Sequence, residues 1–391
     1  MNSSNRYPAL HAMRGMRGAG AIALLLALAN LGGCAWLGFG TEKKPQPLPA
    51  ITGTNAASVS WSANVGKSGG YLFAPGFGDR VIYATARDGS IYALAEDGGR
   101  VVTRLEAKAK VSGGVGVSED IVVVASGKGD IIALDSAGRS LWKSSVSGEV
   151  LAPPTVATGN VVVRTSDGRI LALNRIDGKR KWVFQRAAPA LTLRTNAAVV
   201  VSRGVIYAGY PGGKVIAIEL ESGKPIWEAT ISLARGATEL ERIADVAGLP
   251  VLDDTRICAA VYQGRTGCVE TLNGNVLWSR EISSADGVAI DAKYLYVADV
   301  AGNIFALDKT NGATVWKLEK LQLRDPGTPL VIKGKILVGD KDGLIHVMSP
   351  ENGDLIGRVT TDGSRVVTLW ANGDRAIAQT DKGGVFAIAV Q

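Results

Sequence analysis

Histidine and cysteine are scarce in this chain of 391 residues, which has two histidines and three cysteines. Only His346 follows the N-terminal region, so a Ser-His-Asp triad could use no other histidine and a metal site with several histidines is excluded. His346 stands within "GLIHVM", which reads as a strand. The basic residues are scattered, with no basic run interleaved with aromatics, so the formal net charge of +7 does not indicate nucleic-acid binding. We predict no catalytic site, no metal and no cofactor.

Long apolar runs are lacking as well. The run at residues 19–31 follows two arginines and is shorter than the roughly 20 residues that a membrane-spanning helix needs, which is typical of a cleavable export signal. The order Leu31-Gly32-Gly33-Cys34 resembles the bacterial lipobox, in which the signal is cut before a cysteine that carries lipid. We therefore predict a signal peptide over 1–33 and lipidation of Cys34. The alternative is an ordinary signal with a chance cysteine.

The segment after Cys34 is rich in Gly, Pro, Ser and Thr, and we interpret residues 34–57 as a flexible tether. Several acyl chains on one cysteine would hold the protein stably on one leaflet. By the lipobox rule, Asp after the cysteine retains a lipoprotein at the inner membrane. Ala35 takes that position here, so the predicted location is the periplasmic face of the outer membrane.

A repeat of about 42 residues fills the rest of the chain. "VIYATARDGSIYALAEDGG" at 81 recurs as "IVVVASGKGDIIALDSAGRSLW" at 121 and in six further copies. Each copy has an apolar strand, a tight turn with glycine, and a return strand Gly-x-Ile/Val-x-Ala-Leu/Ile, which is a hairpin pattern. The eight turn glycines are Gly89, Gly129, Gly168, Gly213, Gly264, Gly302, Gly343 and Gly383.

Each hairpin is flanked by two further strands. One short strand precedes it, and a strand that often carries tryptophan follows a second turn; these tryptophans are Trp142, Trp182, Trp227, Trp278 and Trp316. Four strands per repeat make a propeller blade. The pattern thus predicts an all-β fold, an eight-bladed β-propeller of four-stranded antiparallel blades over residues 58–391.

The eighth repeat stops at Gln391, before its outer strand. "SVSWSANV" at 58–65 places Trp61 in a strand-like run ahead of the first repeat. We predict that this N-terminal strand completes the last blade, because closure removes an exposed sheet edge. Otherwise the segment belongs to the tether.

The repeat Gly-x-Ile-x-Ala-Leu-Asp-x-x-x-Gly-x-x-x-Trp resembles the pyrroloquinoline-quinone (PQQ) type propeller repeat. Together with the lipobox, the eight blades and the segments "PALTLR" (189–194) and "ATELERIADVAGLP" (237–250), it resembles the BamB family. That family consists of lipoproteins of the outer-membrane β-barrel assembly (BAM) machinery. The resemblance implies a non-catalytic scaffold that binds the POTRA domains of BamA and other BAM subunits. Direct contact with unfolded outer-membrane protein precursors stays open.

The resemblance also carries partner-contact residues onto Leu191, Leu193 and Arg194, and onto Arg242 and Asp245. The family often has a second Asp where this chain has Ala247. Because both segments connect consecutive blades, they should lie on the same face, and long connections are often functional. The alternatives are that "LTL" is a buried strand and that Arg242 and Asp245 form an internal pair.

A rival function is a PQQ-type quinoprotein or a ligand-sensing propeller in the periplasm. The quinoprotein family often uses a disulfide of adjacent cysteines, and this chain has no such pair. Cys258 and Cys268 lie instead on the two strands of the fifth hairpin. A three-residue turn would place them opposite each other and allow a disulfide, whereas a two-residue turn would place them on opposite faces. The sequence does not choose between the two registers.

Overall fold

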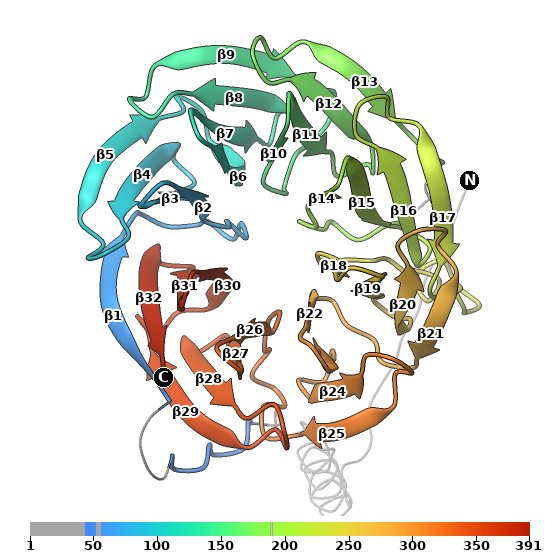
Figure 1. The fold of residues 1–391 in the computed structure, drawn as a ribbon. Helices are drawn as coiled ribbons and strands as arrows, with labels where there is room; N and C mark the ends of the chain where they lie inside the picture. Colours follow the sequence, from blue (N-terminus) through green and yellow to red (C-terminus); the bar gives the residue numbers. More distant parts are fainter. Residues whose placement is uncertain (1–43, 52–55, 188, 190) are drawn as a thin grey trace, which may run out of the picture. The chain divides into compact units, whose positions relative to one another are not determined.

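The computed structural model describes residues 44–51, 56–187, 189 and 191–391, and the propeller belongs to one compact unit, Pro45–Gln391. The described residues form thirty-two strands and no helix, so this part of the chain holds no helix that could cross a membrane. The strands make eight four-stranded antiparallel sheets arranged as blades around a central channel (Figure 1). The predicted eight-bladed propeller is confirmed.

In each blade the first strand lies beside the channel and the fourth lies at the rim (Figure 1). Blade 1 has β2 (Gly76–Gly78), β3 (Val81–Thr85), β4 (Ser90–Ala95) and β5 (Val101–Glu106). Blade 2 has β6 (Val111–Ser118), β7 (Ile121–Ser126), β8 (Asp130–Leu134) and β9 (Ser140–Ser145). Blade 3 has β10 (Thr155–Ala157), β11 (Asn160–Arg164), β12 (Ile170–Asn174) and β13 (Arg180–Phe184). Blade 4 has β14 (Val200–Ser202), β15 (Val205–Tyr210), β16 (Lys214–Glu219) and β17 (Pro225–Thr230).

The second half of the ring repeats this order. Blade 5 has β18 (Val251–Leu252), β19 (Arg256–Ala260), β20 (Thr266–Glu270) and β21 (Val276–Arg280). Blade 6 has β22 (Val288–Ile290), β23 (Tyr294–Ala298), β24 (Ile304–Asp308) and β25 (Thr314–Leu318). Blade 7 has β26 (Leu330–Ile332), β27 (Lys335–Gly339), β28 (Leu344–Met348) and β29 (Leu355–Thr360). Blade 8 has β30 (Val366–Asn372), β31 (Arg375–Thr380), β32 (Gly384–Val390) and β1 (Ala57–Asn64).

The hydrophobic core is divided into eight layers, each between two neighbouring blades. The layer between blades 2 and 3, for example, packs the buried faces of β7 and β8 against those of β11 and β12. The second and third strands are therefore buried on both faces; all six residues of β7 are buried. This explains why these strands read as continuous Ile, Val and Ala runs rather than as an alternating pattern.

The turn between the second and third strands needs glycine where neighbouring backbone approaches closely. Gly129 has φ +85°, and a Cβ at this position would lie 2.1 Å from the carbonyl oxygen of Val146. Only glycine accommodates both the left-handed conformation and this approach. The glycine repeat in the sequence thus records a backbone requirement of seven of the eight hairpin turns, in which the turn glycine has positive φ.

The rim tryptophans join each blade to the next. Trp142 of blade 2 donates its indole N–H to the carbonyl of Arg175 in blade 3 at 2.8 Å, and its ring covers Gly178, where a Cβ would lie 2.4 Å from Trp142 Cε3. The same pair of contacts recurs for Trp61, Trp182, Trp227, Trp278 and Trp316. These tryptophans are structural contacts between blades, in keeping with their predicted place on outer strands.

The N-terminal strand closes the ring as predicted. β1 pairs antiparallel with β32, with Trp61 opposite Ala387. Trp61 then reaches forward to blade 1, where its indole donates to the carbonyl of Glu96 at 2.9 Å. Blade 8 is therefore built from both ends of the propeller sequence.

The predicted signal peptide and Cys34 lie outside the described residues, but part of the expected tether is described. The carbonyl oxygens of Gln46 and Pro49 accept hydrogen bonds from Arg324 at 2.9 Å and from Arg358 at 3.0 Å. Leu48 packs against the core layer between blades 6 and 7. Residues 46–49 are thus bound to the propeller, which differs from a tether flexible along its whole length. Two arginine side chains of distant sequence provide this contact, and sequence composition does not reveal it.

Candidate functional site

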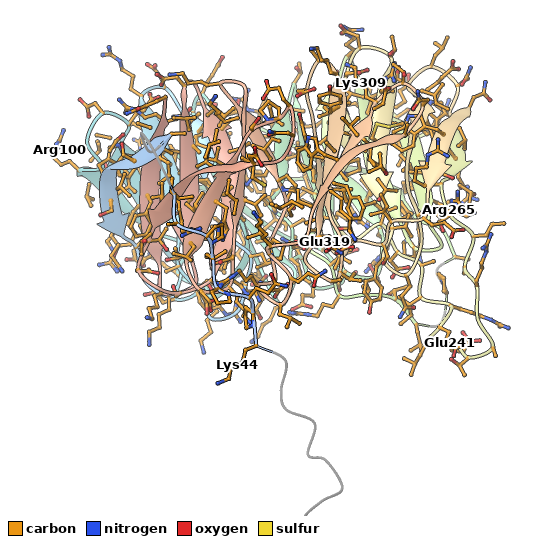
Figure 2. All side chains as sticks on the ribbon, turned by 90° about the horizontal axis from the view of Figure 1, so that it is seen from below. Lys44, Arg100, Glu241, Arg265, Lys309 and Glu319 are labelled. Atoms are coloured by element: carbon orange, nitrogen blue, oxygen red, sulfur yellow. A yellow bond between two sulfur atoms is a disulfide. The ribbon has the colours of Figure 1, made fainter. Side chains whose placement is uncertain are left out.

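Every connection from one blade to the next lies on one face of the ring, because each blade has four antiparallel strands. We call this the connection face; the turns between second and third strands also lie on it. The connection from blade 4 to blade 5 is the longest, spanning residues 231–250. Figure 2 shows Glu241, in this connection, extending beyond the body of the propeller on the side opposite to Lys309.

The tip of this long connection is organised by local hydrogen bonds. Glu241 accepts from the backbone N–H groups of Ala237 at 2.7 Å and of Thr238 at 3.2 Å, while Thr238 Oγ1 accepts from the Glu241 N–H at 3.2 Å. This reciprocal pattern is a capping box. The backbone hydrogen bonds lower the pKa of Glu241. Leu233 and Leu240 stand out from the loop, 71% and 66% exposed.

Asp245 joins the two segments that the sequence singled out. Its carboxylate accepts the N–H of Leu193 at 2.6 Å and the N–H of Gly212 at 3.3 Å, and the residue is only 2% exposed. Burial raises the pKa of Asp245, whereas the two backbone hydrogen bonds and the nearby charge of buried Arg164 act to lower it. The expectation that Asp245 offers its carboxylate to a partner is therefore corrected: one oxygen holds the backbone of Leu193, and the other holds Gly212 in the turn between β15 and β16 of blade 4.

Arg242 and Asp245 do not form the internal pair considered from the sequence. Arg242 donates from Nε to the carbonyl of Gly236 at 3.0 Å and lies 3.7 Å from Glu239. Its side chain is about half exposed. Arg242 therefore stays available at the surface, while Asp245 does not.

Residues 191–194 lie in the connection from blade 3 to blade 4. Arg194 makes a two-pronged ion pair with Glu149, at 3.0 and 2.7 Å, which lowers the pKa of Glu149. The Arg194 guanidinium also lies 5.5 Å from the Tyr71 ring, which Arg87 covers at 4.2 Å. Arg194 is thus tied to residues of other blades rather than free.

The leucines of this segment differ in exposure. Leu191 is 42% exposed, whereas Leu193 is half-buried beside Asp245. Neither belongs to a strand, so the alternative that "LTL" is a buried strand does not describe the structure. Leu191 is the member of the segment most available to a partner.

The two cysteines of blade 5 face each other. Cys258 in β19 pairs directly with Cys268 in β20, and the structure joins them in a disulfide. The hairpin turn holds three residues, since Val261 donates to the carbonyl of Arg265 across residues 262–264. This is the register that permits the bond. Gln263 takes the left-handed conformation in this turn, where the other hairpins use glycine.

His346 is fully buried in β28, as its place in an apolar strand suggested. Its Nε2 lies 3.0 Å from the carboxylate of Asp340, whose other oxygen accepts the N–H groups of Asp342 and Leu344 in the hairpin turn. Among the residues that the structure describes, no three His, Cys, Asp or Glu side chains gather as metal ligands would.

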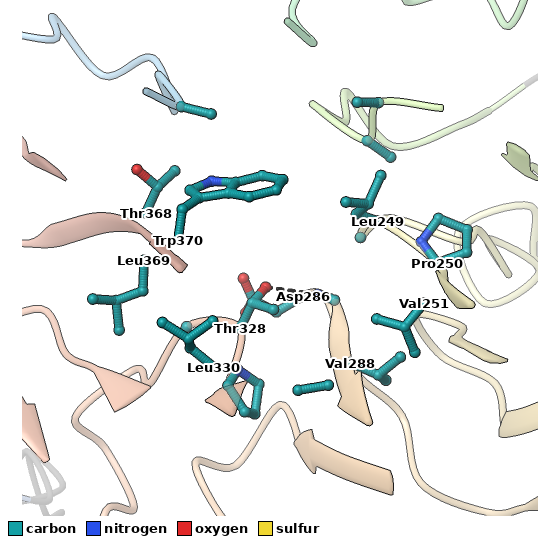
Figure 3. A pocket seen from close by; sticks show the side chains of 18 of the residues that line it. Leu249, Pro250, Val251, Asp286, Val288, Thr328, Leu330, Thr368, Leu369 and Trp370 are labelled. Carbon is teal, nitrogen blue, oxygen red and sulfur yellow. Dashed lines mark hydrogen bonds between the residues drawn. The ribbon is translucent and has the colours of Figure 1, made fainter. Parts of the chain in front are cut away.

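Sequence reasoning missed the channel. A cavity of about 650 Å³ lies at its centre and is lined by first strands and connections of many blades. Asp286, in the connection before blade 6, and Trp370, in β30, both line it (Figure 3). No local signal marks these two residues, because the positions that face the channel are set by the closure of the ring.

The eight blades carry full or partial copies of the repeat Gly-x-Ile-x-Ala-Leu-Asp-x-x-x-Gly-x-x-x-Trp, and an N-terminal strand closes them into a ring. Together these features define a propeller of the PQQ-like repeat class. The family model described as "Outer membrane protein assembly factor BamB" matches residues 87–318. The chain belongs to the BamB family.

Relatives of the same description include that of Nitrosomonas eutropha, 39% identical over 85% of this chain and 81% of the relative. The Escherichia coli K12 relative is 31% identical over 93% of this chain and 97% of its own length. Among solved structures, BamB from Moraxella catarrhalis matches with a TM-score of 0.78 at 24% identity, over 84% of this chain and 98% of that one. A quinohemoprotein alcohol dehydrogenase from Comamonas testosteroni matches with a TM-score of 0.70 at 14% identity, over 85% of this chain and 76% of that one. The last two show the fold alone.

Proposed function

We propose that this protein is a non-catalytic scaffold of the outer-membrane β-barrel assembly machinery that binds the POTRA domains of BamA through its connection face. Membership of the BamB family carries this proposal, since relatives over most of the chain are described as outer membrane protein assembly factors. Other subunits of the complex are further partners. Unfolded outer-membrane protein precursors are a second class of partner on the same assembly path.

The contact surface consists of the exposed leucines of two neighbouring connections, Leu191, Leu233 and Leu240, together with Arg242. Exposed aliphatic side chains flanked by arginine suit an interface anchor. Leu193, Arg194 and Asp245 act behind this surface by holding the 191–194 segment in place. A preorganised surface of this kind loses little conformational entropy on binding.

Capture of BamA by the affinity-tagged full chain, from gently solubilised membranes, tests this surface. The double variant Leu191→Glu with Leu240→Glu should reduce capture at least about tenfold, because it places two charges in an apolar contact. The matched control is Ile176→Glu with Leu272→Glu, which charges two exposed residues, 86% and 84% exposed, on the opposite face. Melting temperatures should stay near the wild-type value for both. Equal capture by the two double variants would refute the assignment of this face.

We also propose that residues 1–33 are a signal peptide and that lipidated Cys34 anchors the protein to the periplasmic face of the outer membrane. The lipobox-like sequence supports this, and so does the binding of residues 46–49 to the propeller, which leaves a short link to the anchor. Cys34→Ala should yield a folded propeller that leaves the membrane fraction after a high-salt wash. A wild-type protein whose mass shows no lipid would contradict the anchor.

We further propose that the protein catalyses no reaction. The channel lining supports this, because Asp286 is its only ionisable side chain among the described residues. Isothermal titration with pyrroloquinoline quinone and Ca²⁺ tests the quinoprotein alternative. Stoichiometric binding would overturn the proposal.

A further inference from the structure

The channel cavity is the 650 Å³ space lined by the first strands of blades 4 to 8 and by several connections, and its lining is predominantly apolar. Leu72, Leu249, Leu330 and Leu369 come from four separate parts of the chain and line it together. Such a cavity with few polar groups is the usual form of a ligand site, because apolar walls supply affinity and single polar groups orient the ligand.

Asp286 is the one ionisable group among the described lining residues. Its carboxylate makes no hydrogen bond or ion pair with any described residue. Its backbone, by contrast, is held in place: the N–H of Asp286 donates to Ser284 Oγ at 3.1 Å, and the N–H of Gly287 donates to Thr328 Oγ1 at 2.9 Å. Burial raises the pKa of Asp286 to about 6; repulsion by Asp325 adds to the rise and the charge of Arg365 opposes it. The fold therefore holds an unpaired, partly desolvated carboxylate in a fixed place.

Trp370 differs from the other described tryptophans. Six of the seven donate their indole N–H to the next blade, and Trp370 makes no such bond. It lies on the innermost strand of blade 8, and Figure 3 shows its ring over the cavity with the Asp286 carboxylate turned toward it. An aromatic ring and a carboxylate directed at the same apolar space suit a cation with an aliphatic stem.

We propose that the channel cavity binds a lysine or arginine side chain carried by an extended apolar polypeptide segment. The carboxylate of Asp286 pairs with the ammonium or guanidinium group, the Trp370 ring covers it, and the leucines contact the aliphatic stem and the flanking apolar residues. A cation compensates the desolvated carboxylate that no protein group pairs. This site is separate from the leucines of the connection face, so it does not rest on the contact proposed there.

Three short peptides test the site by isothermal titration on the full chain: Ac-Leu-Lys-Leu-NH2, its norleucine analogue without the charge, and Ac-Leu-Glu-Leu-NH2. The lysine peptide should bind about tenfold tighter than the norleucine peptide, the usual gain from a charged hydrogen bond, and the glutamate peptide should bind most weakly. Equal binding of the lysine and norleucine peptides would overturn the proposal. Hexylamine binding as tightly as the lysine peptide would overturn the polypeptide part of it.

Two variants and one control locate the effect. Asp286→Asn should remove the preference for lysine over norleucine, and Trp370→Leu should weaken lysine-peptide binding several-fold. Asp79→Asn, an exposed turn residue on the opposite face, should leave both unchanged. Unaltered selectivity in Asp286→Asn would refute the role of the carboxylate.

The pH dependence of the wild-type protein gives a second measurement that needs no variant. The lysine preference should be present at pH 7.5 and largely lost at pH 5, where Asp286 takes up a proton; a preference that is the same at both pH values would refute the site. Capture of BamA should be unchanged in Asp286→Asn, so failure of the peptide site and failure of the connection-face contact are distinguishable.

Discussion

Replacement of Trp61 by alanine is expected to open the propeller between blades 8 and 1. Trp61 is 8% exposed, donates to the Glu96 carbonyl and covers Gly99. Its removal therefore leaves a large cavity and takes away one of the two side-chain hydrogen bonds to that carbonyl, the other of which comes from Arg375. Loss of a buried tryptophan costs about 3 to 5 kcal/mol, and the lost hydrogen bond adds about 1 kcal/mol. Trp61→Phe keeps most of the buried area and should cost about 1 to 2 kcal/mol.

The matched control is Trp142→Ala, because Trp142 is 7% exposed and makes the same two contacts from blade 2 to blade 3. The buried tryptophan surface that is lost is similar for both. β1, however, belongs to blade 8 only through its pairing with β32, so no chain connection inside that blade returns it to its place. Trp61→Ala should therefore lower the free energy of unfolding further than Trp142→Ala.

Urea unfolding and amide hydrogen exchange measure the two effects. Trp61→Ala should speed exchange along β1 and β32, since these amides pair with each other, while Trp142→Ala should leave them protected. Equal destabilisation by the two variants, with unchanged exchange in β32, would refute the idea that this contact holds the ring closed. Bonds from Asn372 and Arg375 to Glu96 also cross this junction and should keep the variant folded at room temperature.

Three further predictions concern stability. Gly312→Ala should lower the free energy of unfolding by about 2 to 4 kcal/mol, because its Cβ would lie 2.4 Å from the indole ring of Trp278. Gly334→Ala is the control, since Gly334 also has positive φ but open space around it, and it should cost only about 1 kcal/mol. Equal losses of stability in calorimetry would contradict the packing argument. Asp286→Asn should stabilise the protein at pH 8, by at most about 3 kcal/mol. Because the pKa of Asp286 is raised in the folded state, the folded protein binds this proton more tightly than the unfolded chain does. The destabilisation by the ionised carboxylate therefore grows as the pH rises from about 4 to 6, and it is absent below pH 4. A gain that persists at pH 3.5 would refute that reasoning. Joint replacement of Cys258 and Cys268 by alanine should cost about 2 to 3 kcal/mol and make the melting temperature insensitive to reductant; continued sensitivity would point to another cause.

The sequence alone determined the number of blades, the order of strands and the closing strand. This was possible because each blade is a local unit whose turns and rim contacts leave a sequence pattern: a turn glycine such as Gly129, and in most repeats a tryptophan such as Trp142 that follows it after 13 or 14 residues. Trp61 could be assigned to the last blade because a ring of sheets leaves no other partner for an unpaired outer strand. These patterns span only about 40 residues each, so they can be recognised in a single sequence.

The tertiary structure decided which of the polar residues are exposed. Asp245 looked like a surface carboxylate in its segment, yet it is bonded to the backbone of Leu193, in the connection from blade 3 to blade 4, and to that of Gly212, in a hairpin turn of blade 4. The disulfide between Cys258 and Cys268 depended on a three-residue turn that composition did not reveal. Asp286 lies in the connection before blade 6 and Trp370 lies in blade 8, 84 residues further on, so only closure of the ring directs both into one cavity. Contacts between distant blades carry no local pattern, and for that reason the channel site is a property of the folded ring.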